Sequence, residues 1–331
     1  MEITDWSTER LLQTSDSYWA TCALHAGVKL DLFSQLATGP AAAADLARRI
    51  GGEPRGVGML ANALVALGLL SKQGECFANT DFASHKLVRS SPDYLGHILM
   101  HHHHLMESWS HLDRSVKTGG PLRDASAFAD AEWRESFLLG MFNLANQLAP
   151  KLVPQIDLGN RRRLLDLGGG PGSWALHFCR QHPQLQAVVF DLPTTRPFAE
   201  ATIQRFELTA RVSFAAGDFL VDPLPRDCDI AWLSHILHGE GPEDAARIVA
   251  LAAAALPPGG LLLIHEFILE DDGAGPVFPA LFSLNMLLGT EGGQSYTNRE
   301  LSDMLRQAGC REVRRLPVRG PNDSGVLAGV V

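Results

Sequence analysis

The sequence predicts an α/β protein in which a Rossmann-like, mainly parallel sheet follows an all-helical, winged-helix-like N-terminal domain. Three observations predict this fold class. From Arg163 onward, short apolar runs alternate with amphipathic helical stretches, as in a parallel sheet covered on both faces. Before about residue 105, short helical segments are separated by glycine, proline or polar clusters. The length of 331 residues, with 46% hydrophobic side chains, supplies apolar material for two domains.

The N-terminal third predicts three packed helices, over residues 23–36, 41–50 and 57–70, and then a two-stranded wing over residues 72–82. Such an outline is typical of DNA-binding proteins, but its charges oppose that function. Residues 1–105 hold eight lysine or arginine residues against ten carboxylates, and Arg55 is the only base at the third helix. A helix that reads a DNA groove needs several basic or amide side chains. We therefore expect no nucleic-acid partner.

The rest of the chain divides into a helical linker over residues 106–157 and an α/β domain over residues 158–331, after a first domain of residues 1–105. The linker pattern is long-period helix with an interruption near residues 119–121, and we expect the linker to line the active site. The strands of the α/β domain are expected to begin near residues 163, 186, 211, 228 and 261. The apolar residues 324–331 predict a last strand at the edge of the sheet.

Net charge and cysteine content disfavour other classes of partner. The formal charge is 28 − 37 = −9, which opposes anionic lipid as well as nucleic acid. Five scattered cysteines without a C-x-x-C pair argue against a disulfide framework. The first residues lack a signal-peptide pattern, and the longest apolar stretch, residues 248–264, is broken by prolines and glycines. We expect a cytoplasmic protein with no membrane partner.

The strongest chemical signal is LLDLGGGPGSW, residues 164–174, in which a strand runs into glycines and then a helix. Gly168, Gly170 and Gly172 allow a sharp turn and a close approach of the backbone to a ligand. Ser173 stands where a dinucleotide site would have its third glycine, which disfavours a nicotinamide cofactor. A purely structural turn is the alternative.

Two acidic residues at or after the ends of later strands narrow the identity of the ligand. Asp191 ends the next strand, 21 residues after Gly170, where it can accept from two ribose hydroxyls. Asp218, beside Phe219, suits the amine and ring of adenine, with a turn-capping acid as the alternative. No lysine or arginine accompanies the glycine loop, which disfavours a polyphosphate. An adenosine without phosphates that is attached to a cation describes S-adenosylmethionine.

At these motifs the chain resembles the dimerising class I S-adenosylmethionine methyltransferases similar to caffeic acid and hydroxyindole O-methyltransferases and their bacterial small-molecule relatives. The resemblance covers nearly the whole chain and rests on LLDLGGGPG, VVFDLP, AAGDF, WLSHILHGE and LPPGGLLLIHEFIL, with ALVALGLL in the first third. It implies a seven-stranded, mainly parallel sheet and a homodimer formed through the N-terminal domain. It also implies transfer of a methyl group to a small-molecule acceptor, with O-methylation of a hydroxyl expected first.

The resemblance also implies roles for individual residues. His238 occupies the position of the family's catalytic base, and Glu266 occupies the position of the acid that orients this base. A base suits the reaction because a hydroxyl that attacks a sulfonium methyl must lose its proton. The positions expected to bind the cofactor are Asp166, Gly168, Gly170, Gly172, Asp191, Leu192, Gly217, Asp218, Phe219 and Ser234.

The acceptor is expected to lie against helices that cross above the carboxyl end of the sheet. For each apolar candidate, ordinary core packing is the alternative. The candidates are Trp109, Met141, Phe142, Asn143, Asn146, His235, Phe278, Phe282, Asn285 and Met286.

Three departures from the family pattern leave the chemistry open. Gly239 and Glu240 follow His238 where plant members carry aspartate and tryptophan, and Ser234 replaces a lysine found in many relatives. Ser295 stands where the family has a second orienting acid. Transfer to sulfur, nitrogen or carbon is therefore an alternative. A regulator that binds the ligand without methylating anything is an alternative of another class.

The 13 histidines raise a metal hypothesis, because four of them, His101–His104, are consecutive. Consecutive side chains fan around a helix and cannot all bind one ion. The run also lacks a cysteine or an acid pair at ligand spacing. We expect no metal, and a site formed by His235, His238 and His265 is the alternative.

Overall fold

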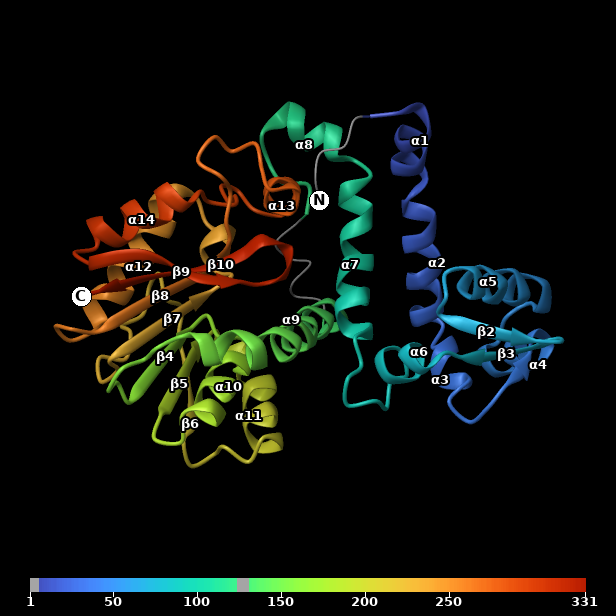
Figure 1. Cartoon of the computed structure of the whole chain (residues 1–331), viewed down its shortest axis with the longest axis horizontal. Coiled ribbons are helices and arrows are strands. Elements are labelled where there is room, and N and C mark those ends of the chain that lie inside the picture. Colours follow the sequence, from blue (N-terminus) through green and yellow to red (C-terminus); the bar gives the residue numbers. More distant parts are fainter. Residues whose placement is uncertain (1–5, 124–130) are drawn as a thin grey trace. The chain divides into compact units, whose positions relative to one another are not determined.

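The computed structural model describes residues 6–123 and 131–331, which form two compact units (Figure 1). The first unit comprises the described residues of Met1–Met106 together with Glu132–Asn143. The second comprises those of Glu107–Ala131 together with Leu144–Val331. The boundary falls within helices α7 (Gly96–Trp109) and α9 (Ala131–Leu152), so the expected linker contributes to both units.

The first unit packs short helices around a small sheet. Its core contains Leu32, Phe33, Leu46, Leu64 and Phe77, all almost fully buried. The hairpin expected as a wing is present as β2 paired with β3, and β1 adds a third strand on the other side of β3. The elements that precede α7 are α1 (Thr8–Asp16), α2 (Tyr18–Lys29), α3 (Leu32–Gln35), β1 (Ala41–Ala42), α4 (Ala43–Ile50), α5 (Pro54–Ala66), β2 (Leu70–Gln73), β3 (Cys76–Asn79) and α6 (Asp81–Lys86).

Two helices of this unit end earlier than the sequence predicts. The helix expected over residues 23–36 is divided because Asp31 adopts a left-handed conformation, with φ of 53°. The Ser34 hydroxyl donates to the Asp31 carboxylate at 2.6 Å and stabilises this break. The helix expected to reach Leu70 ends at Ala66, because Gly68 turns the chain with φ of 75° into β2. With its three strands, the unit is therefore not all-helical.

The second unit contains the expected seven-stranded sheet, in the order β6-β5-β4-β7-β8-β10-β9. Strands β4 to β8 pair in parallel, while β10 pairs antiparallel with both β8 and β9. The strands are β4 (Arg163–Leu167), β5 (Gln186–Asp191), β6 (Val212–Ala216), β7 (Ile230–Ser234), β8 (Leu261–Phe267), β9 (Arg311–Arg319) and β10 (Ser324–Val330).

The expectation that residues 324–331 form an edge strand is wrong. β10 is buried along almost its whole length and lies between β8 and β9. The edge strand on this side of the sheet is β9, which carries exposed charged residues along REVRRLPVR. Charged side chains on an edge strand oppose pairing with other chains, whereas an apolar strand fits the interior.

Helices cover both faces of this sheet (Figure 1). On one face α9, α10 (Ser173–Gln181) and α11 (Arg196–Arg205) pack through residues such as Phe178 and Ile203. On the other face α12 (Pro242–Ala255) and α14 (Asn298–Gln307) pack through residues such as Ile248 and Leu305. Helices α8 (Leu112–Thr118) and α13 (Val277–Gly289) pack against each other.

The strand order determines where a ligand site can form. β4 is the first strand of the unit, and its neighbours are β5 on one side and β7 on the other. Such a reversal of strand order opens a crevice at the carboxyl ends of parallel strands. The ends of β4, β5, β7 and β8 carry the residues singled out in the sequence. In the part of the chain described, no helix combines the length and apolar character needed to cross a membrane.

Candidate active site

The loop between β4 and α10 depends on its glycines. Gly168, Gly170 and Gly172 have φ of 64°, 55° and 78°, in the left-handed region that favours glycine. A Cβ on Gly168 would lie 2.7 Å from Cγ2 of Ile236 and 3.5 Å from the Phe219 ring. The loop therefore needs glycine both for its conformation and for its close contact with the segment after β7.

Asp191 joins this loop to the end of β5. Its carboxylate accepts hydrogen bonds from the backbone N–H of Gly170 at 2.7 Å, from that of Leu192 at 2.7 Å, and from the Thr195 hydroxyl at 3.1 Å. Burial raises the pKa of Asp191, and these three donors oppose that rise. They also fix the direction of the carboxylate, whose oxygens retain capacity for further donors.

Asp166, near the end of β4, is buried with one oxygen unsatisfied. Oδ2 accepts from the Ala175 N–H at 3.0 Å, while the buried Oδ1 has no hydrogen-bond partner. Burial raises the pKa of Asp166 to about 7. A buried oxygen without a partner costs free energy unless a ligand supplies a donor.

Asp218 caps a turn, as its alternative interpretation proposed. Its Oδ1 accepts from the Leu220 N–H at 2.9 Å, and its own N–H donates to Asp222 at 2.8 Å. This capping leaves the second carboxylate oxygen of Asp218 for other donors. Gly217, just before it, packs so closely on the Phe190 ring that a Cβ there would overlap the ring.

His238 and Glu266 form a hydrogen-bonded pair between the end of β7 and the end of β8. Nδ1 of His238 donates to Oε2 of Glu266 at 2.7 Å, and the other oxygen accepts from the Leu237 N–H at 2.9 Å. Glu266 is 1% exposed. Burial by itself would raise the pKa of this carboxyl, but His238 and His235 hold it well below its usual range. An ionised Glu266 fixes the tautomer of His238 that leaves Nε2 as the basic nitrogen.

His235 lies beside this pair in a left-handed conformation, with φ of 57°. Its Nδ1 is 3.6 Å from Oε2 of Glu266, beyond a hydrogen bond. Within the described ranges, His235, His238 and Glu266 are the group whose possible metal-ligating atoms converge, all within 4.8 Å of one another. The alternative metal set of the sequence named His265 in place of Glu266.

His265 has other partners. Its Nδ1 lies 2.9 Å from the hydroxyl of Ser234, and its ring stacks on Trp232 at a centroid distance of 5.4 Å. Burial lowers the pKa of His265 well below the ordinary value, so the ring is neutral. Ser234, expected at the cofactor, thus uses its hydroxyl in a contact between β7 and β8.

Two phenylalanines contact the imidazole of His238, and a third packs against both of them. The Phe282 ring meets it edge-on at 4.7 Å, and the Phe267 ring lies parallel to it at 6.2 Å. Phe267 also contacts Phe278 and Phe282 at 4.8 Å each. Phe267 is absent from the residues expected at the site, and its place directly after Glu266 at the strand end was the only signal for it.

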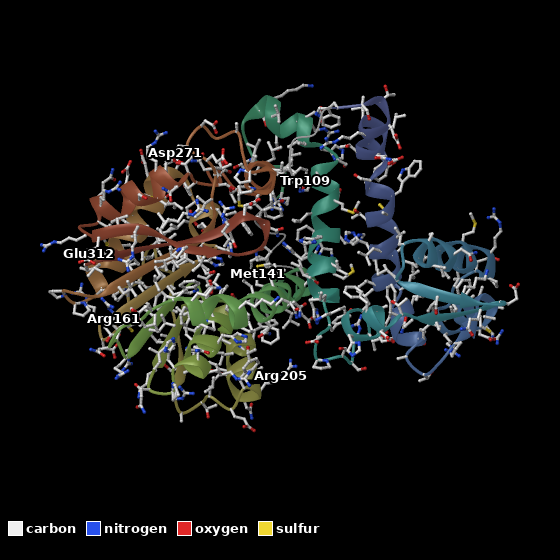
Figure 2. All side chains as sticks on the ribbon, viewed as in Figure 1. Trp109, Met141, Arg161, Arg205, Asp271 and Glu312 are labelled. Carbon is white, nitrogen blue, oxygen red and sulfur yellow. The ribbon has the colours of Figure 1, made fainter. Side chains whose placement is uncertain are left out.

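The other acceptor candidates are distributed over both units. Trp109 donates from Nε1 to Oδ1 of Asn285 at 3.2 Å, within the second unit (Figure 2). Met286, next to Asn285, is buried. Oδ1 of Asn146 lies 2.6 Å from Nε2 of His177 and thus meets α10. The part of α9 assigned to the first unit carries Met141, Phe142 and Asn143, whereas His238 and Glu266 belong to the second.

The histidine run lies on α7, in the first unit. Its members contact different neighbours. The ring of His103 meets that of His25 edge-on at 5.6 Å, and the ring of His104 stacks on Trp133 at 4.9 Å. Ser295, in the loop after α13, donates its hydroxyl to the Pro279 carbonyl at 2.8 Å.

Comparison with known proteins identifies the family and the fold. Residues 116–311 match a family model described as an O-methyltransferase domain, and residues 12–89 match an O-methyltransferase dimerisation domain. Over 326 residues the chain is 39% identical to a 3-hydroxy-5-methyl-1-naphthoate 3-O-methyltransferase of Streptomyces sahachiroi, covering 97% of this chain and 94% of that one. The chain belongs to the O-methyltransferase family.

Two further proteins extend this comparison. The structure of human N-acetylserotonin methyltransferase with S-adenosylmethionine superposes on this O-methyltransferase with a TM-score of 0.89 at 26% identity, covering 100% of this chain and 99% of that one. An N,N-dimethyltransferase of Streptomyces rimosus is 31% identical and covers 91% of this chain and 90% of its own. The family, the fold and dependence on S-adenosylmethionine, all expected from the sequence, are thereby confirmed.

Proposed function

We propose that this S-adenosylmethionine-dependent O-methyltransferase methylates a hydroxyl of a small aromatic acceptor, with His238 as the general base. The observation that carries this proposal is the 2.7 Å hydrogen bond between Nδ1 of His238 and the buried carboxylate of Glu266. An ionised acid on one nitrogen makes the other nitrogen a better proton acceptor. The pair also lies at the carboxyl end of the parallel strands, where the glycine loop follows β4.

The residues present at the loop fit S-adenosylmethionine, which supplies an electrophilic methyl group on a sulfonium. The buried, unpartnered Oδ1 of Asp166 offers an acceptor for an ammonium group. The anchored carboxylate of Asp191 accepts from ribose hydroxyls. Gly168 lets the backbone and the Phe219 ring approach each other closely enough to enclose the nucleoside.

The residues around His238 determine how the acceptor reacts. Holding the hydroxyl in line with the methyl group can supply roughly 7–11 kcal/mol of the acceleration. Proton removal by His238 at Nε2 contributes about 10²- to 10⁴-fold more. Glu266 positions the imidazole and stabilises the positive charge that it gains.

An aromatic acceptor fits the walls of this site. Phe267 and Phe282 contact the His238 ring, and Phe278 packs against both of them. Such a cluster of rings binds a flat aromatic molecule by offset or edge-on stacking. The relative from Streptomyces sahachiroi is named for O-methylation of a hydroxylated naphthoate, which is such a molecule. The acceptor that we propose is therefore a hydroxylated one- or two-ring aromatic compound.

N-methylation is the second candidate, because a relative with 31% identity is an N,N-dimethyltransferase. A neutral amine attacks through a free lone pair and loses its proton afterwards. Such an acceptor depends less on His238 than a hydroxyl does. Mutating His238 therefore separates the two candidates.

The test replaces His238 by alanine and measures methylation of 2-naphthol and of 2-naphthylamine by mass spectrometry. Turnover of the naphthol should fall by about 10²- to 10⁴-fold, with binding of S-adenosylhomocysteine retained. The Glu266→Gln variant should lose less, because the imidazole remains. The exposed His85 provides a matched control, and His85→Ala should act as the parent does.

The pH profile of the parent should show a rising limb that reports loss of a proton from the base, and this limb should disappear in His238→Ala. Near-full turnover of the naphthol by the alanine variant would show that the hydroxyl needs no base here. Methylation of the naphthylamine alone would favour the second candidate.

A further inference from the structure

Arg123 is held against the last turn of α13. The backbone N–H groups of Leu122 and Arg123 donate to the Leu288 carbonyl at 3.1 and 3.0 Å, and Nη2 of Arg123 donates to the Asn285 carbonyl. A Cβ at Gly289 would overlap the guanidinium, so a glycine at this position makes room for it. The charge therefore has a defined position beside α13.

This partly buried charge has no counter-charge in the described parts of the chain. Burial lowers the pKa of Arg123 to about 10, and no acidic group contributes to the shift. Its Nε is buried and has no hydrogen-bond partner there. The carbonyl at the helix end satisfies Nη2 but leaves Nε and the net charge uncompensated. A buried guanidinium normally pairs with an anion, because desolvating an unpaired charge is costly.

One face of α13 joins Arg123 to the reacting centre. Phe278, Phe282, Asn285 and Gly289 follow each other at helical spacings of four, three and four residues, which places them on one stripe. Phe282 contacts the His238 ring, while Gly289 contacts Arg123. The seven residue steps from Phe282 to Gly289 span about 10 Å along the helix axis. A two-ring aromatic compound with substituents at both ends covers such a distance.

Asn285 adds donors beside the guanidinium. Trp109 donates to its Oδ1, and this hydrogen bond fixes the orientation of the amide. The NH₂ group of Asn285 then carries two donors, and within the described residues it makes no hydrogen bond. A carboxylate can accept from an arginine and an amide together.

We propose that Arg123, assisted by Asn285, binds a carboxylate of the acceptor and thereby directs the hydroxyl at its other end toward His238. The inference deepens the proposed function and rests on it for the identity of the reacting group. Arg123 is then a specificity-determining residue that selects hydroxylated aromatic acids over neutral phenols.

The experiment compares 6-hydroxy-2-naphthoate with its neutral amide, 6-hydroxy-2-naphthamide. The parent should prefer the acid at least tenfold in kcat/KM. In Arg123→Met this acid-to-amide ratio should fall at least tenfold, mainly through KM of the acid. Arg123→Lys should retain part of the preference, because it keeps the charge but loses the planar fork.

Arg161, which also donates to a backbone carbonyl and lies far from Trp109 in Figure 2, is the matched control. Its variant Arg161→Met should keep the parent ratio.

Titration of the protein saturated with S-adenosylhomocysteine measures binding of the same two compounds without turnover. The parent should bind the acid at least tenfold more tightly than the amide, and Arg123→Met should lose this difference. If Arg123→Met does not fold, Asn285→Asp places a negative charge beside the guanidinium, and it should lower the ratio in the same way.

The outcomes separate the two hypotheses. If the parent shows no preference for the acid, or if the variants weaken acid and amide equally, Arg123 is only a brace for α13 and the inference is overturned. If the parent binds the acid preferentially but methylates neither compound, the carboxylate site stands and the proposed O-methylation of such acceptors fails.

Discussion

At the scale of single residues, Asp191 makes the firmest prediction. Its carboxylate holds the Gly170 N–H and is expected to accept from the ribose, so Asp191→Ala removes both contacts. We expect the affinity for S-adenosylmethionine to fall by about 1.5–3 kcal/mol, roughly 10- to 150-fold. Isothermal titration calorimetry measures this change.

Asp227 provides the control for that experiment, because its exposed carboxylate pairs with Arg163 at the opposite end of β4. Asp227→Ala should bind the ligand as the parent does. If Asp191→Ala binds S-adenosylmethionine with the affinity of the parent, Asp191 does not bind the ribose.

The nucleoside and catalytic residues recognised from the sequence share one property: each lies in a motif at or near the end of a strand. Asp191 closes a strand, and His238 with Glu266 lies in motifs next to β7 and β8. Phe267 has only its place after Glu266 at the end of β8 as a signal, and Arg123 has none. The role of Phe267 depends on which helix crosses above the sheet, and the importance of Arg123 depends on its buried Nε, which has no hydrogen-bond partner among the described residues. Neither property is present in the local sequence.

At the scale of elements, the parallel strands were predictable because each is a short apolar run, and all of them except β6 are followed by a helix. The position of β10 was not. An antiparallel insertion between β8 and β9 is a property of the whole sheet, and the last strand in the chain is not thereby the last in space. The strand β9 was not predicted at all, since REVRRLPVR is rich in charge and its apolar residues do not alternate regularly with polar ones.

A histidine on helix α10 predicts that the stability of the fold decreases at acidic pH. His177 on this helix packs on Phe206, and burial, with Arg180 nearby, lowers its pKa from 6.5 to about 4. Above pH 6.5 neither the folded nor the unfolded chain protonates this ring. As the pH falls from 6.5 toward 4, only the unfolded chain binds the proton, so the free energy of unfolding decreases. The decrease from this residue is about 1–3 kcal/mol.

Urea denaturation at pH 7 and pH 4.5 measures this dependence. His177→Gln should lose about 1–3 kcal/mol less stability than the parent between the two pH values, because the side chain no longer titrates. His85→Gln, at an exposed position, serves as the control. If the free energy of unfolding falls equally in the parent and in His177→Gln, groups other than His177 cause the acid sensitivity.

At the scale of the whole molecule, the N-terminal helices expose apolar side chains that a monomer would leave in water. Leu12 is 60% exposed and Trp19 is 64% exposed, and Trp6, Leu11 and Tyr18 are exposed in the same stretch. Contiguous exposed apolar residues are typical of protein interfaces. The stretch extends into the region that matches the O-methyltransferase dimerisation domain, residues 12–89. We therefore expect two copies of the chain to associate through α1 and α2.

Light scattering after size-exclusion chromatography tests this homodimer. The parent should elute with twice the mass of the chain at micromolar concentration. The double variant Leu12→Glu, Trp19→Glu should elute as a monomer, because two carboxylates cannot be buried without partners in an apolar interface. Val116→Glu, at an exposed apolar position on α8 of the second unit, should leave the dimer intact. A dimer that survives the double variant would place the interface elsewhere on the chain, and a monomeric parent would contradict dimerisation altogether.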